Sequence, residues 1–586
     1  MAGFFPTFAW GGPEASRQPP VLGLDVPAMD AERAAIVQGD RSVLLEVDHP
    51  GYEAARDALA RFAEIEKSPE HVHTYRISDL SLWNAAATGM GAEEVIEALS
   101  AISRFALPEH VCHEIRDQMQ RYGLCSLHLV TGDPQHLRLR VAEPLVRERL
   151  GADAKLADLM RPAPDGFLLQ TRYRGAIKQA LLKLGYPVTD EAGLQPGEPL
   201  PVALRDERFT PYDYQRQAAR AFVDSGGHGV VALPCGAGKT IVAMVAMEAL
   251  QTRTMILTSG KEACQQWRRE LLDKTQLSEE QVCIYDSRKK TTAAVTLTTY
   301  HLFARKGGGG ATGHVHFDRL AGEPWGLVVY DEVHLLPAPI FRLTAELQAR
   351  RRLGLTATLV REDGRAGDVF ALIGPKRFDM PWRQLEASGH IAAATCIELR
   401  VPLCETLRTP YAVAPLREQP RVAAENPLKL RALRDLVERH PGERVLVIGS
   451  YLEPLEAAGA LLDAPVVTGK TAHRERERCY ADFRSGKLRR LVLSRVGNFA
   501  IDLPEANVLV QISGTMGSRQ EEAQRLGRVL RPKPGGALFY SIVTRDTVDQ
   551  KHALHRQLFL TEQGYRYYIE DWDADDAPTG RPPQLH

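Results

Sequence analysis

The sequence predicts an α/β protein with two parallel-sheet domains, preceded by small mixed α+β domains. Short apolar runs alternate with helical segments in two separate series, and such alternation is typical of parallel sheets covered by helices. A glycine-rich loop between the apolar run Gly229–Ala232 and the helical segment Ile241–Leu250 sets the first series apart from the second. With 586 residues, the chain has room for about three to five domains of ~100–200 residues.

The composition is that of an ordinary globular protein, with 44% hydrophobic and 25% charged residues. No apolar stretch approaches the ~18 residues of a membrane-spanning helix, and the N-terminus lacks the basic start of a secretory signal, so we expect a cytoplasmic protein without a membrane partner. The eight cysteines include no C-x-x-C pair, which predicts reduced thiols rather than a zinc ribbon or a disulfide framework. A net charge of −1 excludes a globally basic surface but not a local basic channel.

Two small domains are expected before the glycine loop. Residues 1–35 are rich in Pro and Gly and predict a loose leader within a first domain that ends near residue 120. In that domain, alternation over Arg41–Asp48 predicts a strand, and apolar spacing predicts helices over Tyr52–Glu66 and Ser78–Phe105.

The second small domain is expected over residues 121–200. Its alternating segments Cys125–Val130 and His136–Val141 predict a hairpin, and a helix is predicted over Arg174–Leu184. The Pro-rich segment Gln195–Pro201 is typical of a linker.

The two large domains are expected over residues 201–387 and 388–570, and residues 571–586 are expected to form a disordered tail. The second series contains no glycine loop. The predicted strands are Thr254–Thr258, Val282–Tyr285, Val295–Thr298 and Gly326–Tyr330 in the first domain, and Arg444–Ile448, Ala464–Val467, Arg490–Ser494 and Val508–Ile512 in the second.

The glycine loop has the residues that cradle a phosphate. Glycines let the backbone N–H groups point inward, and the N-terminus of the following helix adds partial positive charge. Lys239 would reach the β- and γ-phosphates and the Thr240 hydroxyl would bind Mg²⁺, although Leu233 stands where such loops usually begin with glycine. A plain turn with a chance Gly-Lys-Thr is the alternative. The expected cofactor-binding residues of the loop are Pro234, Cys235, Gly236, Ala237, Gly238, Lys239 and Thr240.

Two carboxylates close the predicted strand that ends at Tyr330. Because ligands bind at the carboxyl ends of parallel strands, Asp331 and Glu332 are expected to face the glycine loop. Asp331 would hold Mg²⁺ and Glu332 would polarise the attacking water, which is the division of labour that phosphoryl transfer needs. Alone, such a pair is more often a solvated strand end.

The second large domain offers a complementary basic segment. Gln524, Arg528 and Arg531 lie within two helical turns, and guanidinium groups suit the stabilisation of a γ-phosphate from across a cleft. Asp502 is a carboxylate that would orient these arginines or bind the ribose. A basic helix surface is the ordinary alternative.

Together these segments resemble the superfamily-2 helicases, and more closely the XPB family, from about Phe209 to Tyr567. The resemblance implies two RecA-like domains with ATP and Mg²⁺ between them, which open DNA or translocate on it in the 3′→5′ direction. It also implies a role in repair of the nucleotide-excision type and an intracellular, nucleoid-associated location. The resemblance is carried by Leu233–Thr240, the D-E-V-H box at Asp331, Leu353–Asp363, Leu372–Lys376, Asp502–Asn507 and Gln524–Arg531.

The resemblance also assigns roles to single residues. Gln215 corresponds to the glutamine that reads adenine, and Arg528 and Arg531 correspond to the arginine fingers. Arg361, Glu362 and Asp363 match the R-E-D element that is associated with strand separation. The residues implied in contacts with a single strand of DNA are Gln266, Thr298, Thr299, Thr468 and Gly469.

Two regions depart from the family pattern. The stretch 405–424 is short, which predicts that the thumb insertion of the archaeal forms is reduced or absent. Residues 122–200 stand where XPB proteins carry a damage-recognition domain. These departures leave open how the chain holds a duplex.

Three functions compete with a DNA helicase that acts on single-stranded and forked DNA. The chain could be an RNA-stimulated ATPase, because such motors contact mainly the nucleic-acid backbone. It could be an ATP-driven clamp or translocase that acts with a partner nuclease and unwinds little. A regulator that only binds nucleotide is disfavoured by the complete sets of carboxylates and arginines.

Overall fold

The structure is a computed structural model. It describes residues 32–572 except for 70, 193–195, 206, 235, 306, 308–313, 337–346, 348, 358–365, 381–384, 386–387, 389–393, 495–505, 515–536 and 563–564. The described residues form four sheets: one of four strands, one of five and two of seven. Every helix in this part of the chain is too short or too polar to cross a membrane.

The first unit is a four-stranded antiparallel sheet in the order β1-β2-β4-β3, with helices beside it. The helix predicted over Tyr52–Glu66 is wrong in its second half, because Glu64–Lys67 pairs with β4 and thereby buries Ile65. The helix predicted over Ser78–Phe105 is interrupted at Gly89, whose φ of +92° does not fit a right-handed helix. The elements are β1 (Ala35–Val37), β2 (Ser42–Glu46), α1 (Tyr52–Leu59), β3 (Glu64–Lys67), β4 (Val72–Arg76), α2 (Asp79–Ala87), α3 (Ala92–Ile102) and α4 (Glu109–Arg121).

The second unit is a five-stranded sheet in the order β7-β8-β6-β5-β9. The predicted hairpin is confirmed as the antiparallel pair β5–β6, and the predicted helix at Arg174 is confirmed as α7. The elements are β5 (Cys125–Val130), β6 (Asp133–Val141), α5 (Pro144–Gly151), α6 (Ala154–Ala157), β7 (Met160–Ala163), β8 (Gly166–Gln170), η1 (Thr171–Tyr173), α7 (Arg174–Lys183) and β9 (Val188–Asp190).

The first lobe is a parallel sheet in the order β12-β13-β11-β14-β15-β10-β16. Val230 and Val231 of β10 are fully buried in two different apolar clusters, so helices cover both faces of the sheet. The elements are α8 (Asp213–Asp224), β10 (His228–Ala232), α9 (Lys239–Leu250), β11 (Thr254–Thr258), α10 (Lys261–Lys274), β12 (Val282–Ile284), β13 (Val295–Thr299), α11 (Tyr300–Phe303), α12 (Val315–Ala321), β14 (Leu327–Asp331), η2 (Val333–Leu335), β15 (Arg351–Thr356), α14 (Ala366–Leu372) and β16 (Lys376–Asp379).

The second lobe is also a parallel sheet, in the order β19-β20-β18-β21-β22-β17-β23. Asp571 closes β23 and Trp572 is buried, so these two residues of the predicted tail belong to the lobe. The short stretch 405–424 holds two helices, α16 and α17. The elements are β17 (Ala394–Val401), α16 (Glu405–Val413), α17 (Gln419–Ala424), α18 (Pro427–Arg439), β18 (Val445–Gly449), α19 (Leu452–Leu462), β19 (Val466–Val467), α20 (His473–Arg484), β20 (Arg490–Ser494), β21 (Val508–Gln511), β22 (Ala537–Thr544), α23 (Val548–Glu562) and β23 (Arg566–Asp571).

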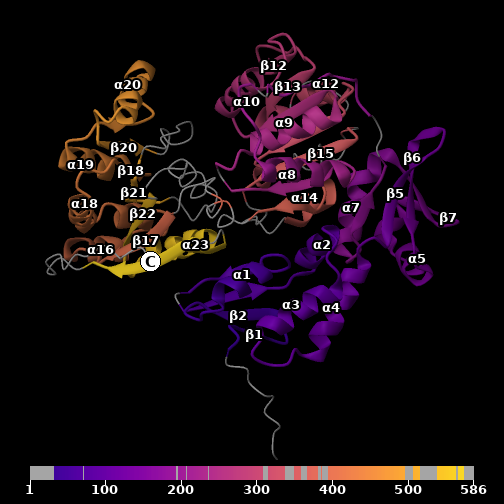
Figure 1. The fold of residues 1–586 in the computed structure, drawn as a ribbon, viewed down its shortest axis with the longest axis horizontal. Coiled ribbons are helices and arrows are strands. Elements are labelled where there is room, and N and C mark those ends of the chain that lie inside the picture. Colours follow the sequence, from indigo (N-terminus) through magenta and orange to yellow (C-terminus); the bar gives the residue numbers. More distant parts are fainter. Residues whose placement is uncertain are drawn as a thin grey trace, which may run out of the picture.

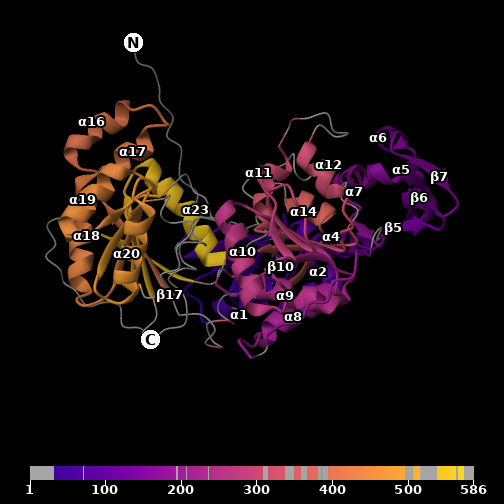
Figure 2. The same ribbon diagram turned by 90° about the horizontal axis from the view of Figure 1, so that it is seen from above.

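Both N-terminal units pack against the first lobe (Figures 1 and 2). The second unit lies on the side of that lobe away from the second lobe, whereas the first unit lies below it in Figure 1, and its β3 contacts α23 of the second lobe. From the first unit, the Asn84 side chain accepts a hydrogen bond from the Lys376 backbone N–H at 2.9 Å. From the second unit, the Gln179 amide donates to Asp368 at 2.8 Å. The predicted α/β class with two parallel-sheet domains and mixed N-terminal units is therefore confirmed.

Candidate nucleotide and nucleic-acid site

The order of three strands gathers the predicted nucleotide residues at one edge of the first lobe. Strand β15 lies between β10 and β14, and all three run parallel. The glycine loop follows β10, Asp331 ends β14, and Thr356 ends β15. Because parallel strands end at the same edge of a sheet, these segments meet there although more than 100 residues separate the first from the last.

The glycine loop can only take its course with glycine at its hinge. Gly238 caps α9 in the left-handed region, with φ 76°. A Cβ atom at this position would be strained by this φ and would lie 2.3 Å from the Gln215 Nε2, so a side chain would also displace the Gln215 amide from the loop. Gly236 also has a positive φ, 85°. The loop therefore leads directly into the N-terminus of a 12-residue helix, where backbone N–H groups are available to an anion.

Lys239 and Glu332 face each other across this edge. Their Nζ and Oε1 atoms are 3.4 Å apart, and the two side chains are only 10% and 14% exposed. The same Nζ lies 3.5 Å from the Leu233 carbonyl oxygen, and Thr240 is half-buried in the first turn of α9. Glu332 has φ +51°, a conformation that costs energy for a residue with a side chain. This turn directs the carboxylate of Glu332 toward Lys239.

Asp331, at the end of β14, is partly buried. Burial raises the pKa of its carboxyl group to about 6, and the adjacent Glu332 acts in the same direction. The indole Nε1–H of Trp267 donates to the Asp331 Oδ2 at 2.9 Å and opposes this shift. The Tyr300 hydroxyl donates to the backbone oxygen of Asp331 at 2.7 Å. The sequence did not predict a contact of either aromatic residue with Asp331.

His334 joins the ends of two strands. Its Nδ1 is hydrogen-bonded to the Thr356 Oγ1 at 2.6 Å and lies 3.6 Å from the Glu332 Oε2. The acidic segment after β14 is thereby tied to the Thr-Ala-Thr segment at the end of β15. In the sequence, the histidine of the D-E-V-H pattern, His334, is the residue that indicates this contact.

Gln215 is hydrogen-bonded to the glycine loop. Its Oε1 accepts from the Tyr212 N–H at 3.0 Å, and its Nε2 donates to the Ala237 carbonyl oxygen at 3.0 Å. The Tyr214 hydroxyl donates to the same oxygen at 2.8 Å, and Gln215 is 4% exposed. The amide that sequence reasoning assigned to adenine is thus engaged with the loop itself. The ring of Tyr212 stacks on Tyr214 and stays 48% exposed.

The predicted single-strand contacts differ in accessibility. Gln266 is exposed on α10, and the half-buried Thr299 accepts from the Leu302 N–H at 3.3 Å as the cap of α11. Thr298 is 0% exposed within β13, so its side chain does not reach the surface, because this strand is buried on both faces of the sheet. Thr468 and the exposed Gly469 follow β19 in the second lobe.

Several predicted residues lie outside the described part of the chain. They are Cys235 of the loop, Arg361, Glu362 and Asp363 of the R-E-D element, and Asp502, Gln524, Arg528 and Arg531 of the second lobe.

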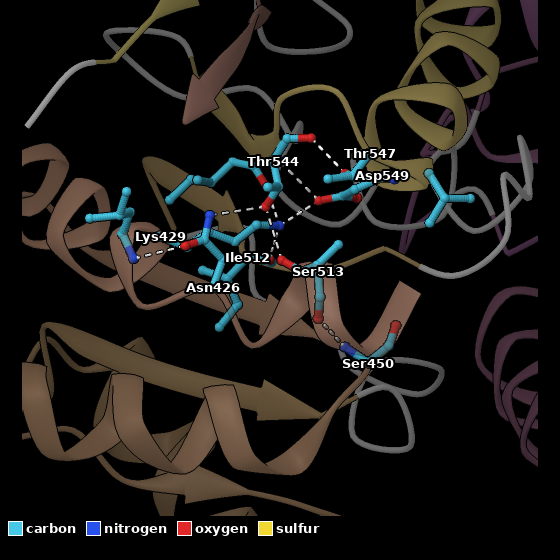
Figure 3. A network of polar contacts seen from close by, with 12 residues as sticks. Asn426, Lys429, Ser450, Ile512, Ser513, Thr544, Thr547 and Asp549 are labelled. Carbon is cyan, nitrogen blue, oxygen red and sulfur yellow. Dashed lines mark hydrogen bonds and ion pairs between the residues drawn. The ribbon is translucent and has the colours of Figure 1, made fainter. Parts of the chain in front are cut away.

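The carboxyl edge of the second lobe is organised by a buried lysine (Figure 3). Lys429 of α18 donates to the carbonyl oxygens of Ile512 and Ile542 at 3.0 and 2.9 Å, and pairs with Asp549 of α23. The Ser513 Oγ beside it accepts from the Ser450 N–H at 2.9 Å. These bonds link the ends of β18, β21 and β22, so this edge of the sheet has a fixed shape.

Three family models match separate parts of the chain. The model described as ERCC3/RAD25/XPB C-terminal helicase matches residues 385–575. The model described as type III restriction enzyme, res subunit, matches residues 208–361, and the one described as helicase conserved C-terminal domain matches residues 35–163.

Curated relatives match nearly the whole chain. The chain is 49% identical over 545 residues to DNA 3′-5′ helicase XPB of Mycobacterium tuberculosis, which covers 92% of this chain and 98% of that protein. It is 50% identical over 551 residues to DNA 3′-5′ helicase XPB of Kineococcus radiotolerans, with 93% and 98% covered. It is 31% identical to the general transcription and DNA repair factor IIH helicase/translocase subunit XPB of Antonospora locustae, with 91% and 80% covered. The chain therefore belongs to the XPB family of superfamily-2 DNA helicases.

Proposed function

We propose that the chain uses ATP and Mg²⁺ to open duplex DNA in the 3′→5′ direction during DNA repair. The observation that carries this proposal is the meeting of Lys239, Asp331 and Glu332 at one edge of the first-lobe sheet. A motor needs these three groups, since hydrolysis of a phosphoanhydride requires a cation, a metal carboxylate and a group that activates water. The relatives named for DNA repair support the biological role.

The pair of Lys239 and Glu332 gives each residue a task. Without nucleotide, each side chain compensates the charge of the other in a nearly buried place. A γ-phosphate competes for the Lys239 ammonium group, and Glu332 is then released to orient water and accept its proton. His334 lies 3.6 Å from Glu332 and is hydrogen-bonded to Thr356, so a movement of Glu332 also affects the end of β15.

The described residues fit a bound magnesium ion. Burial, and secondarily the carboxylate of Glu332, disfavour the ionised form of Asp331, and a cation beside the two carboxylates would favour it. A hydroxyl and a carboxylate are ligands that Mg²⁺ accepts beside phosphate oxygens. We assign these roles to Thr240 and Asp331, and the ion would neutralise charge on the transferred phosphate.

The second lobe completes the motor in this proposal. Gln524, Arg528 and Arg531 reach the γ-phosphate from across the interface of the lobes, and Asp502 orients them. Hydrolysis then separates the lobes and moves DNA, which Gln266, Thr299, Thr468 and Gly469 contact. We further propose that the domains divide near residues 120, 200 and 387, and that the protein works in the cell interior near the nucleoid.

The nucleic acid that activates hydrolysis tests this function. We expect single-stranded DNA and forked DNA to increase ATP turnover at least about tenfold, whereas RNA of the same sequence increases it little. RNA as the sole activator contradicts the proposal. If DNA stimulates hydrolysis but the strands of a fork are not separated, the result favours the clamp that acts with a nuclease. Repeating the fork assay with the partner nuclease then distinguishes the clamp from the helicase.

The R-E-D element is tested by replacing Arg361, Glu362 and Asp363 with alanine. We expect ATP turnover to remain while the separation of a fork is lost, because the element is assigned to the DNA and not to the nucleotide. Equal loss of both activities indicates a role in folding instead.

A further inference from the structure

Two aromatic donors hold Asp331 from the side opposite the glycine loop. Trp267 comes from α10 and Tyr300 is the first residue of α11. The strands that lead into these helices, β11 and β13, lie on one side of β14 in the sheet, whereas β15 and β10 lie on its other side. The Trp267 indole bonds the carboxylate at 2.9 Å and the Tyr300 hydroxyl bonds the backbone oxygen at 2.7 Å. The two donors thus come from the helices that follow β11 and β13, and they reach Asp331 from the two faces of the sheet.

The helices α10 and α11 also line a groove. A hollow of about 400 Å³ lies between α10 and the ends of β12 and β13. Its lining includes Lys261, Arg268 and Lys289, together with Thr299 at the start of α11. Lys261 and Lys289 are exposed, and Glu279 and Asp286 are the only carboxylates among the lining residues. Arg268 is paired with Glu279 at 3.3 Å, so the exposed Lys261 and Lys289, beside the Thr299 hydroxyl, are the groups that suit a sugar-phosphate backbone.

The groove and the buried donors are adjacent in the chain. Trp267 precedes Arg268 and follows the exposed Gln266, and Tyr300 follows Thr299. The two aromatic side chains are 3% and 2% exposed and are therefore packed without freedom to adjust. A strand that pulls α10 or α11 by a fraction of an ångström must move the indole or the phenol, and with it Asp331.

The bond from Trp267 is directed at the group whose geometry matters. A hydrogen bond to a charged carboxylate is short and directional, so it fixes the rotamer of Asp331 as well as its ionised form. Tyr300 fixes the backbone of the same residue. Together they leave the carboxylate with one orientation for each position of α10 and α11.

We propose that Trp267 and Tyr300 are positioning residues that transmit the binding of a nucleic-acid strand in the groove of Lys261, Arg268 and Lys289 to the orientation of Asp331. This inference rests on the proposed function, in which Asp331 holds Mg²⁺. The nucleic acid then stimulates hydrolysis by aligning the metal carboxylate, in addition to any effect on the approach of the two lobes.

The experiment compares Trp267→Phe and Tyr300→Phe with the wild type in the full chain. Each variant keeps an aromatic ring and loses one donor. Trp325→Phe is the matched control, because the Trp325 indole is also buried in the first lobe and donates to the Leu320 carbonyl oxygen at 2.7 Å. Thermal melts verify that all three variants are folded.

The first readout is Mn²⁺ bound together with a non-hydrolysable ATP analogue, measured by electron paramagnetic resonance with and without a thymidine oligonucleotide. We expect the oligonucleotide to lower the dissociation constant of Mn²⁺ in the wild type and in Trp325→Phe. In the two test variants, the factor by which it lowers that constant should be about tenfold smaller. The second readout is the ratio of DNA-stimulated to basal ATP turnover, which should fall in parallel. Oligonucleotide affinity measured without nucleotide and metal should stay within about twofold, because the groove is intact.

Two outcomes overturn the inference. Wild-type coupling in both Trp267→Phe and Tyr300→Phe excludes the two bonds as transmitters. Equal losses in these variants and in Trp325→Phe indicate a general effect of removing a buried donor. The proposed function fails separately, if the wild type itself hydrolyses no ATP in the presence of DNA.

Discussion

At the scale of single residues, burial changes the ionisation of groups outside the nucleotide site. His73 of β4 is 5% exposed, and its Nδ1 lies 2.9 Å from the Tyr52 hydroxyl. Burial, and secondarily the nearby Arg56, lower the pKa of His73 from 6.5 to about 4. The folded first unit therefore keeps this ring neutral at a pH where the unfolded chain protonates it.

This difference predicts that acid destabilises the first unit. Between pH 6.5 and 4 the unfolded state binds the extra proton, so the free energy of unfolding falls as the pH falls, by about 2 kcal/mol at pH 5 from His73 alone. Hydrogen exchange of the β2 and β4 amides at pH 7 and pH 5 measures this loss in the free energy of unfolding. His73→Gln keeps an acceptor for Tyr52 without titrating, and should show a loss smaller by that amount. Equal losses in both proteins contradict the assignment.

The residues of the candidate site were predictable in unequal measure. Lys239 and Glu332 could be predicted because each belongs to a short motif: Lys239 follows Gly238 in the glycine loop, and Glu332 follows Asp331. Trp267 could not, because it lies 64 residues from Asp331 and only the order of β11 and β14 brings them together. The burial of Thr298 could not be predicted, since the resemblance covers a segment, and only the position of β13 inside the sheet buries this hydroxyl while Thr299 at the strand end stays half-buried.

At the scale of elements, Lys429 is the centre of the second lobe's carboxyl edge (Figure 3). It is 1% exposed and bonds two strand ends and Asp549. We predict that Lys429→Met lowers the stability of this lobe by about 3–5 kcal/mol, because Asp549 is left as an uncompensated buried charge. Chemical unfolding of the full chain, followed by hydrogen exchange in β21 and β22, measures the change.

A second substitution separates charge from packing at this edge. Lys429→Met combined with Asp549→Asn removes both charges and should recover more than half of the lost stability. No recovery in the double variant means that the backbone bonds of Lys429, rather than its charge, determine the stability of the lobe.

The strands of the two lobes were more predictable than those of the N-terminal units. Strands such as Thr254–Thr258 and Arg490–Ser494 are buried on both faces, so they are continuous apolar runs and their predicted positions are confirmed. Strand β3, Glu64–Lys67, carries a single apolar residue, and only its pairing with β4 defines it. A helix-like spacing upstream therefore extended the predicted helix too far.

At the scale of the whole molecule, the second N-terminal unit is fastened to the first lobe near a buried cluster of charges. Arg174 and Lys178 of α7 both bond Asp190, at 2.9 and 2.8 Å, and these side chains are 3–6% exposed. The two cations hold the pKa of Asp190 well below its usual range, and its charge also interacts with the buried Arg352 of β15. The unit and the lobe are thus packed as one body.

We predict that Asp190→Asn loosens this body. Arg174, Lys178 and Arg352 then remain as buried cations without a counter-charge, which costs about 3–5 kcal/mol. Limited proteolysis should cut between residues 190 and 200 faster than in the wild type. Asp165→Asn is a matched control in the same unit, because Asp165 is 40% exposed and its ion pairs with Arg138 and Arg140 contribute little. Equal cleavage of all three proteins contradicts the role of Asp190.

The central claim is that nucleotide hydrolysis at the first-lobe edge drives strand separation. The most direct measurement is the unwinding of a forked DNA with a 3′ tail, by the wild type and by Lys239→Ala, with DNA binding recorded for both. We predict that the wild type separates the strands only with ATP and Mg²⁺, and that Lys239→Ala binds the fork but neither hydrolyses ATP nor separates the strands. Undiminished hydrolysis and unwinding by Lys239→Ala would contradict the claim.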